Sequence, residues 1–314
     1  MVEVRRKTEI PATGSNSPNF VGVAGCAAAS CHGGRGIAGG EYTHWATHDA
    51  AHRRAYDILL SDDSQSIAQK LELTVSPHKA ARCLACHAMD AGESAVIHGE
   101  RFAIEFGVAC ESCHGAAGQW VARHTGQTWK SLSSVQKEEF GFRDLRSLGT
   151  RADTCVVCHV GSSNGTVDHE LIAAGHPRLS FELAAYHTLL PKHWDQSAAV
   201  RREPDQELRL WAIGQVAAAK AQSDISISHA EAALRAGSDR VIPDLAEFDC
   251  HACHHDLADE DWRGRSKTRG ALGTPQWGSW TVAPARWIAR ESHAVFGPDA
   301  AAVEASLEKW ALLM

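Results

Sequence analysis

Five pairs of cysteines, each followed directly by a histidine, are the residues whose types and spacing point most clearly to chemistry. Four pairs have two intervening residues and read Cys83-Leu-Ala-Cys86-His87, Cys110-Glu-Ser-Cys113-His114, Cys155-Val-Val-Cys158-His159 and Cys250-His-Ala-Cys253-His254. The pair in Cys26-Ala-Ala-Ala-Ser-Cys31-His32 has four intervening residues. These motifs use all ten cysteines of the chain.

Cys-x-x-Cys-His is the motif that attaches c-type haem. Its two thiols add to the two vinyl groups on one edge of the porphyrin, and the histidine is held beneath the iron as the proximal ligand. Zinc sites and redox dithiols also use cysteine pairs, but neither needs a histidine directly after the second cysteine. A disulfide across two residues would be strained. The sequence therefore predicts five covalently bound haem c groups, whose proximal ligands are His32, His87, His114, His159 and His254.

The ligand on the other face of each iron is predicted to be a second histidine. Met1 and Met314 are terminal, and Met89 follows a proximal histidine by two residues, so methionine is a poor candidate. The chain has 19 histidines, far more than the proximal positions require. Ligation by two histidines favours lower reduction potentials than ligation by histidine and methionine.

Composition and charge exclude several classes of protein. Apolar residues make up 44% of the 314 residues and charged residues 22%, as in globular proteins. The net charge of −7, without a block of Lys or Arg, argues against a nucleic-acid partner. The sequence contains no apolar run of membrane-spanning length. Covalent c-type haem is assembled outside the bacterial cytoplasm, so we expect a periplasmic or extracellular protein. The charged start at Met1 lacks a signal-peptide core, so we expect the signal to have been removed.

The pattern of apolar residues predicts a mainly α-helical multihaem fold with much irregular loop and little or no β-sheet. Helices are expected over 41–72, 181–190 and 298–312, with Ser180 capping the second helix and Pro191 ending it. His44, His48 and His52 would share one stripe of the first helix. A helical hairpin broken near Ser223-Asp224 is expected over 205–236. Loop with a short helix is expected over 115–150, a turn over 161–165, and an irregular covering segment over 262–287.

The surroundings of the motifs resemble the cytochrome c-554 family of multihaem electron carriers. The resemblance rests on Trp45 followed by Ala51-His52-Arg-Arg-Ala-Tyr56, on Gly107-Val-Ala-Cys110-Glu-Ser-Cys113-His114-Gly115, and on His124 ten residues further. The segments 168–194 and 248–257 are similar to a larger, pentahaem branch of the group. The resemblance covers about residues 21–260, and the string around Cys110 is its most specific part.

The resemblance implies distal iron ligands by position. One distal ligand of the family lies in an Ala-His-x-x-Ala context, and this position falls on His52. Another lies ten residues after the third proximal histidine, and this position falls on His124. The same role is carried over to His169, His176 and His193. Pro177 favours an extended backbone at His176, which suits the presentation of a ligand. Further candidates are His78, His187, His229 and His255.

This chain also departs from the family. The type member has four haems, one of them with an open distal face, and it has no counterpart of the C-terminal region. We therefore expect an extended arm over 1–20, a c-554-like four-haem domain over 21–195, and a helical region over 196–314 that carries the fifth haem.

Two functions remain. The favoured one is electron transfer between redox protein partners, such as a membrane-bound quinol-oxidising or respiratory complex, with oligomers or filaments as a variant. The alternative is an oxidoreductase acting on a small nitrogen or sulfur compound at an open haem, which also needs acid or base groups nearby. The chain lacks the Cys-x-x-Cys-Lys motif of pentahaem nitrite reductases. It has only Tyr42, Tyr56 and Tyr186 for a haem cross-link of the hydroxylamine oxidoreductase kind.

Overall fold

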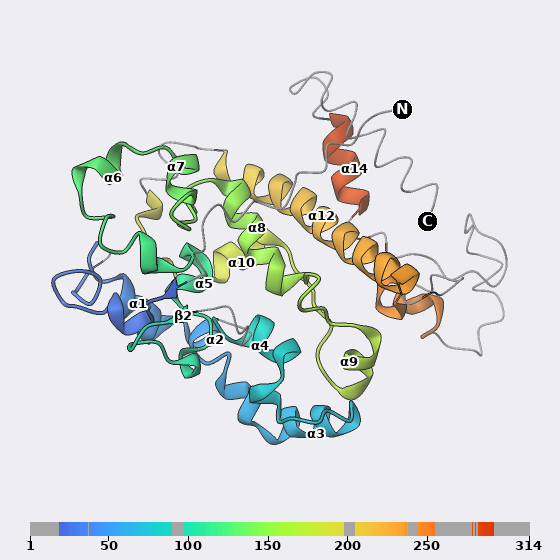
Figure 1. The fold of residues 1–314 in the computed structure, drawn as a ribbon. Helices are drawn as coiled ribbons and strands as arrows, with labels where there is room; N and C mark the ends of the chain where they lie inside the picture. The colour runs from blue at the N-terminus through green and yellow to red at the C-terminus, as the bar shows by residue number, and fades with distance from the viewer. Residues whose placement is uncertain are drawn as a thin grey trace.

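The computed structural model describes residues 19–36, 38–89, 97–197, 205–235, 237, 244–254, 278, 280 and 282–291. These residues form helices joined by long irregular connections (Figure 1). Two parallel strands of two residues each, β1 (Asn19–Phe20) and β2 (Ile97–His98), are the strands of this described part. The prediction of a mainly α-helical fold is therefore confirmed. The expected helix over 298–312, His255 and most of the arm and of the covering segment lie outside the described residues.

The region predicted as one helix over 41–72 is broken into shorter pieces, so that prediction is wrong. It comprises α1 (Glu41–His48), α2 (Ala50–Arg53), the 3-10 turn η2 (Asp57–Leu60) and α3 (Asp62–Lys70). Asp49 leaves the helical conformation, and its carboxylate accepts a hydrogen bond from the His52 amide at 3.3 Å. Ser61 caps α3 in the same way, through the Ser64 amide at 3.2 Å.

Three helices end on a proximal histidine. They are α4 (Ala81–His87), α5 (Cys110–His114) and α8 (Leu148–His159). The first and fifth motifs follow or contain 3-10 turns, η1 (Val23–Gly25) and η7 (Cys250–Ala252). Four of the cysteine pairs therefore lie on a helical turn, where residues three apart share one side, and the first pair begins directly after a 3-10 turn.

Short elements connect these helices. They are η3 (Pro77–Lys79), η4 (Ile104–Phe106), η5 (Ala117–Gln119), α6 (Gln127–Ser131), α7 (Ser134–Glu138), α9 (His169–Ala174), α10 (Leu183–Leu189) and η6 (Leu245–Glu247). The expected loop with short helices over 115–150 and the turn over 161–165 are confirmed, the turn closing with a bridge between Ser162 and Gly165.

The predicted cap of the helix over 181–190 is wrong. Glu182 caps α10, because its carboxylate accepts hydrogen bonds from the amides of Ala184 at 2.9 Å and Ala185 at 2.8 Å. Ser180 instead accepts a hydrogen bond through its carbonyl from the Tyr186 hydroxyl, at 2.7 Å. The helix still stops before Pro191, as expected, with Leu190 in an extended conformation.

The expected hairpin over 205–236 is one continuous helix, α12 (Gln206–Arg235), so that prediction is also wrong. The polar residues at the expected break bond within the helix. The Ser223 hydroxyl donates to the Ala219 carbonyl at 2.9 Å, and Asp224 pairs with Lys220 at 2.8 Å. The helix α14 (Val282–Glu291) packs on α12, so the end of the segment expected to be irregular is helical.

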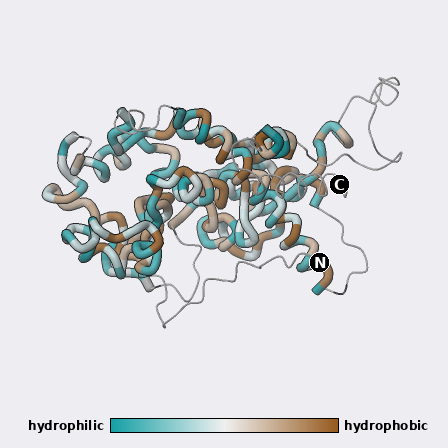
Figure 2. Tube along the Cα trace, turned by 90° about the horizontal axis from the view of Figure 1, so that it is seen from above, coloured by the Kyte–Doolittle hydropathy of each residue, from teal (hydrophilic) through white to brown (hydrophobic). Residues whose placement is uncertain are grey.

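The largest apolar cluster joins α8, α10 and α12, which lie side by side in Figure 1. It contains Leu148, Ala152, Val156, Leu183, Leu210, Ala217 and Ala221. Cys155 of the fourth motif packs on this cluster, and three smaller clusters lie apart from it, two of them against Cys110 and Cys83. Hydrophobic and hydrophilic residues interleave along the helices (Figure 2), and no helix in the described part of the chain is long and apolar enough to cross a membrane.

Gly214 allows α12 to approach α10. A Cβ atom at this position would lie 2.5 Å from the Cβ of Leu183, whose side chain is fully buried. We expect Gly214→Ala to overpack this contact and to reduce stability by about 1–3 kcal/mol. Thermal unfolding followed by circular dichroism measures the change.

Gly149→Ala is the matched control for this contact. Gly149 lies in the first turn of α8, where the nearest atom to an added Cβ is the Ser147 hydroxyl oxygen at 3.8 Å. Since alanine is the better helix former, this variant should unfold at the wild-type temperature or above it. A Gly214→Ala protein that is as stable as Gly149→Ala would contradict the packing argument.

Candidate functional site

A cavity of 2420 Å³ runs through the middle of the helical body. Ordinary small-molecule pockets have volumes of about 300–1,000 Å³, so this space is large enough for several bulky groups. All residues of the first four motifs that could bind haem line it, namely Cys26, Cys31, His32, Cys83, Cys86, His87, Cys110, Cys113, His114, Cys155, Cys158 and His159. The cavity explains why the apolar clusters around the motifs stay separate.

The fifth motif lies away from this cavity, beyond α9. Its cysteines, Cys250 and Cys253, are exposed. Arg178 contacts this motif, with its Nη1 at 3.5 Å from the Cys250 sulfur. The fifth motif is nevertheless tied to the main body, because the His169 amide donates to the Asp244 carboxylate at 3.0 Å.

Each of the five proximal histidines faces one other histidine at nearly the same separation. The ring centroids are 6.0 Å apart for His32 and His124, 6.2 Å for His159 and His52, 6.4 Å for His87 and His176, 6.2 Å for His114 and His193, and 6.4 Å for His254 and His169. These partners are the five histidines that the sequence nominated as distal ligands.

The separation of the paired rings fits a metal ion between them. An imidazole nitrogen binds a transition metal at about 2 Å and the ring centroid lies about 1 Å further away, so two rings on opposite faces of one ion have centroids about 6 Å apart. Direct stacking brings rings closer, as with His44 and His48 at 4.5 Å. The geometry of all five pairs therefore fits one iron each.

Hydrogen bonds at the second ring nitrogen orient several of these imidazoles. The Nδ1 atom of His32 bonds to Glu41 at 2.9 Å, and that of His52 bonds to Asp49 at 2.9 Å. His87, His124 and His176 bond through Nδ1 to the carbonyls of Ala55, Val121 and Pro177. Such bonds leave Nε2 as the metal-binding atom and are typical of metal-bound histidines.

Burial keeps two of the proximal imidazoles neutral. Desolvation lowers the pKa of His114 and that of His159 to about 4. The hydrogen bond to Asp49 instead raises the pKa of His52. Since only the unprotonated nitrogen binds a metal, the environment of His114 and His159 already favours the form required of a ligand.

The remaining described candidates face other partners. His44 stacks on His48, and the ring of His78 lies edge-on to that of Tyr56, with the ring centroids 6.4 Å apart. The Nε2 atom of His187 lies 2.8 Å from Arg151, and the Nδ1 atom of His229 lies 2.8 Å from Glu247. The break between α1 and α2 turns His52 away from the stripe that it was expected to share with His44 and His48.

Glu111, inside the third motif, joins that motif to two other segments. Its side chain is 2% exposed. Its carboxylate accepts hydrogen bonds from the amides of Val21 at 2.9 Å, Gly22 at 2.7 Å and Ala117 at 2.7 Å. These bonds fix the chain just before Cys26 against the third motif. The sequence pattern gives no sign of this role of Glu111, because only tertiary contacts reveal its burial.

The comparison with known families supports this site over part of its length. Residues 25–115 match the family model of cytochrome c554 and c-prime. The match begins just before Cys26 and ends just after His114, so it spans the first three motifs. Cytochrome c554 proteins are multihaem c-type cytochromes, and the match therefore implies covalent haem c and suggests electron transfer. No curated protein and no solved structure matches the chain.

The expected resemblance to the cytochrome c554 group extends further than this match. It was expected over about residues 21–260, whereas the family model covers 25–115. The fourth and fifth motifs, and four of the five distal candidates, His124, His169, His176 and His193, lie beyond it. Their assignment rests on the motif and on the geometry of this chain.

Glu111→Ala tests the junction between the first and third motifs. The variant would leave three amides without their acceptor, so we expect stability to fall by about 2–5 kcal/mol. Unfolding by guanidinium measures the loss. Glu105→Ala, at an exposed glutamate of the same region, is the control and should change stability by less than about 0.5 kcal/mol. Equal effects of the two substitutions would show that the buried carboxylate is not structural.

Proposed function

We propose that this chain is a pentahaem c-type cytochrome that transfers electrons between redox partners through haems ligated by two histidines each. The observation that carries the proposal is the common separation of 6.0–6.4 Å in all five histidine pairs. In each pair the proximal histidine follows a cysteine pair that can attach the porphyrin. When bound, the haem iron supplies a one-electron redox centre.

The proposed assignment gives every haem a complete ligand set. The first haem is held by Cys26, Cys31, His32 and His124; the second by Cys83, Cys86, His87 and His176; the third by Cys110, Cys113, His114 and His193; the fourth by Cys155, Cys158, His159 and His52; and the fifth by Cys250, Cys253, His254 and His169. The protein contributes the orientation of these rings and the exclusion of water from the cavity.

Contacts between motifs support a continuous row of haems. The sulfurs of Cys26 and Cys110 lie close together, and so do those of Cys86 and Cys158. Cys113 also lies near Cys155. Because these sulfurs bond to porphyrin edges, the order in space is first, third, fourth, second. Helix α9 extends the row, since His169 begins it for the fifth haem and His176 follows it for the second.

The same geometry argues for a carrier over an enzyme. An oxidoreductase acting at a haem needs an iron with one open face. In the proposed assignment each iron has a histidine on both faces, so no described feature favours the alternative. We also propose a periplasmic or extracellular location, since c-type haem is attached there, and redox proteins as partners, including a membrane-bound quinol-oxidising complex.

The number of haems follows directly from the proposal. When a host that attaches c-type haem secretes this chain, the mass of the protein should exceed the mass of the polypeptide alone by the mass of five haems. The double variant Cys250→Ser/Cys253→Ser should lose one haem and keep four, because the fifth motif lies outside the common cavity. Mass spectrometry and the pyridine haemochrome assay measure both. A wild-type protein with four haems would refute the assignment of the fifth motif.

The distal ligands can be tested one at a time. His52→Ala, His124→Ala, His169→Ala, His176→Ala and His193→Ala should each convert one low-spin ferric haem into a high-spin haem, because each removes one axial ligand. Electron paramagnetic resonance measures the conversion. His48→Ala is the control, since His48 is exposed and faces His44, and its spectrum should stay entirely low-spin. A low-spin spectrum from any of the five variants would remove that histidine from the assignment.

A further inference from the structure

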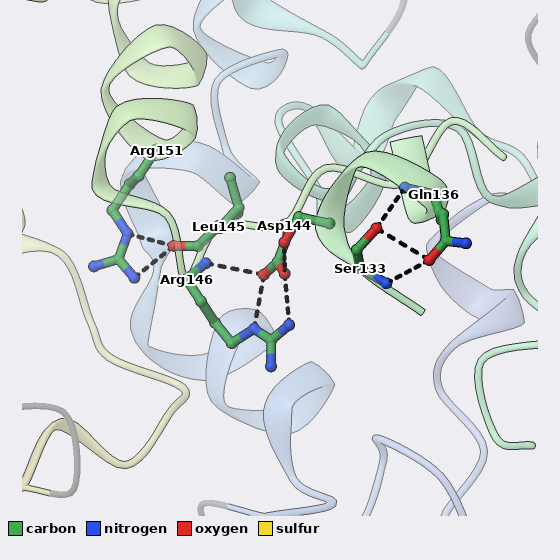
Figure 3. A network of polar contacts seen from close by, with 7 residues as sticks. Ser133, Gln136, Asp144, Leu145, Arg146 and Arg151 are labelled. Carbon is green, nitrogen blue, oxygen red and sulfur yellow. Dashed lines mark hydrogen bonds and ion pairs between the residues drawn. The ribbon is translucent and has the colours of Figure 1, made fainter. Parts of the chain in front are cut away.

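Arg151 is held rigidly in the wall of the cavity. Its Nε and Nη2 atoms donate to the Leu145 carbonyl at 3.0 Å and 2.8 Å (Figure 3). Its Nη1 atom donates to His187 Nε2 at 2.8 Å. The guanidinium also lies over the ring of Trp194, with Cζ at 5.1 Å from the ring centroid. Contacts from three sides therefore fix one orientation of the side chain.

These contacts leave part of the guanidinium unused. An arginine side chain has five N–H donors, and the contacts with Leu145 and His187 occupy three of them. The remaining two lie one on each terminal nitrogen, the pair of atoms with which arginine binds a carboxylate in a bidentate manner. Within the described residues no carboxylate is bonded to Arg151.

Arg146, five residues earlier on the same wall, shows the contrasting case. Its Nε and Nη2 atoms donate to the two oxygens of the buried Asp144 at 2.8 Å and 2.5 Å, as Figure 3 shows. The charge of Arg146 is thus balanced within the chain. Arg151 has only neutral partners, because desolvation and the nearby charge of Arg151 lower the pKa of His187 to about 4.

The desolvated positive charge of Arg151 requires an anion as its counter-ion. Burial lowers the pKa of this guanidinium, but arginine stays protonated at neutral pH. A partly buried cation without a counter-ion is unfavourable unless an anion occupies its free donors. Arg151, His187 and Trp194 all line the cavity, together with Cys155 of the fourth motif and His193 of the third pair. The anion that binds these free donors must therefore lie in the cavity.

We propose that the free fork of Arg151 binds a propionate carboxylate of the third or the fourth haem. The proposal rests on the proposed function, because haem supplies two carboxylates per porphyrin and no described carboxylate bonds to Arg151. His187 and Trp194 are positioning residues that hold the guanidinium toward the cavity. The positive charge offsets the negative propionate near the iron, so Arg151 raises the reduction potential of that one haem.

Arg151→Gln in the haem-loaded protein tests this role. Loss of the cation should lower the reduction potential of one of the five haems by a roughly tenfold change in its reduction equilibrium, which equals about 59 mV for one electron. Optical redox titration measures the potentials. Resonance Raman spectroscopy should also show a shifted propionate bending band, which a merely structural role would not move. Arg235→Gln is the control and should leave both readouts unchanged, because Arg235 is exposed, pairs with Glu231 in the last turn of α12 and does not line the cavity.

The haem that responds is identified by combining variants. In His193→Ala the third haem carries the high-spin signature, and in His52→Ala the fourth does. Adding Arg151→Gln to each shows whether the shifted potential belongs to the marked haem. If Arg151→Gln does not fold, Arg151→Lys serves instead, since a single ammonium cannot form the fork and should still shift the Raman band.

The outcomes separate this proposal from the proposed function. The mass of the same sample counts the haems, so a wrong haem count refutes the function independently of Arg151. Five haems with unchanged potentials and an unchanged propionate band in the Arg151 variant would overturn the proposal while leaving electron transfer in place. A shifted potential in a haem other than the third or fourth would overturn it as well.

Discussion

The fold depends on keeping ten imidazole rings in five facing pairs. In each pair the two ring centroids are far enough apart for one metal ion to lie between them. Rings at this distance do not touch, so their helices cannot pack on one another through them. Helices α4, α5 and α8 each end at such a ring, and the interior between them is a cavity instead of an apolar core. Stability must come from the periphery, where α12 packs on α8 and α10, and from smaller apolar clusters such as those against Cys83 and Cys110.

Buried carboxylates hold segments of the chain together, as an apolar core does in other proteins. Glu111 joins the chain before Cys26 to the third motif, and Asp49 both caps α2 and orients His52. Asp144 fixes the connection between α7 and α8 through Arg146 and Ser134. Glu111 and Asp144 bind groups that are distant from them or from each other in sequence, which is how a chain with few aromatic residues can hold its loops around a large cofactor space.

The chemistry-bearing residues were predictable because they follow from local covalent requirements. The cysteine and histidine spacing is set by the porphyrin itself, and the family resemblance nominated five distal histidines that all face a proximal one. The helix boundaries were less predictable. Asp49 breaks the helix over 41–72 by capping the next turn, and Ser223 and Asp224 bond inside α12 instead of breaking it. Polar residues such as Asp and Ser can either break a helix or bond within it. Only the packing around these residues decides which of the two occurs.

The burial of the cysteines fits the proposed row of haems. In the order first, third, fourth, second, fifth, the ends of the row are the first and the fifth haem. Cys31, Cys250 and Cys253 are the exposed cysteines, and they belong to those two motifs. The six cysteines of the three inner motifs are all more enclosed. A conductor needs its terminal centres near the surface, where partners dock, and its inner centres shielded from them. An enzyme with one reactive haem would have no need for two exposed ends, so this gradient of burial favours transfer through the molecule.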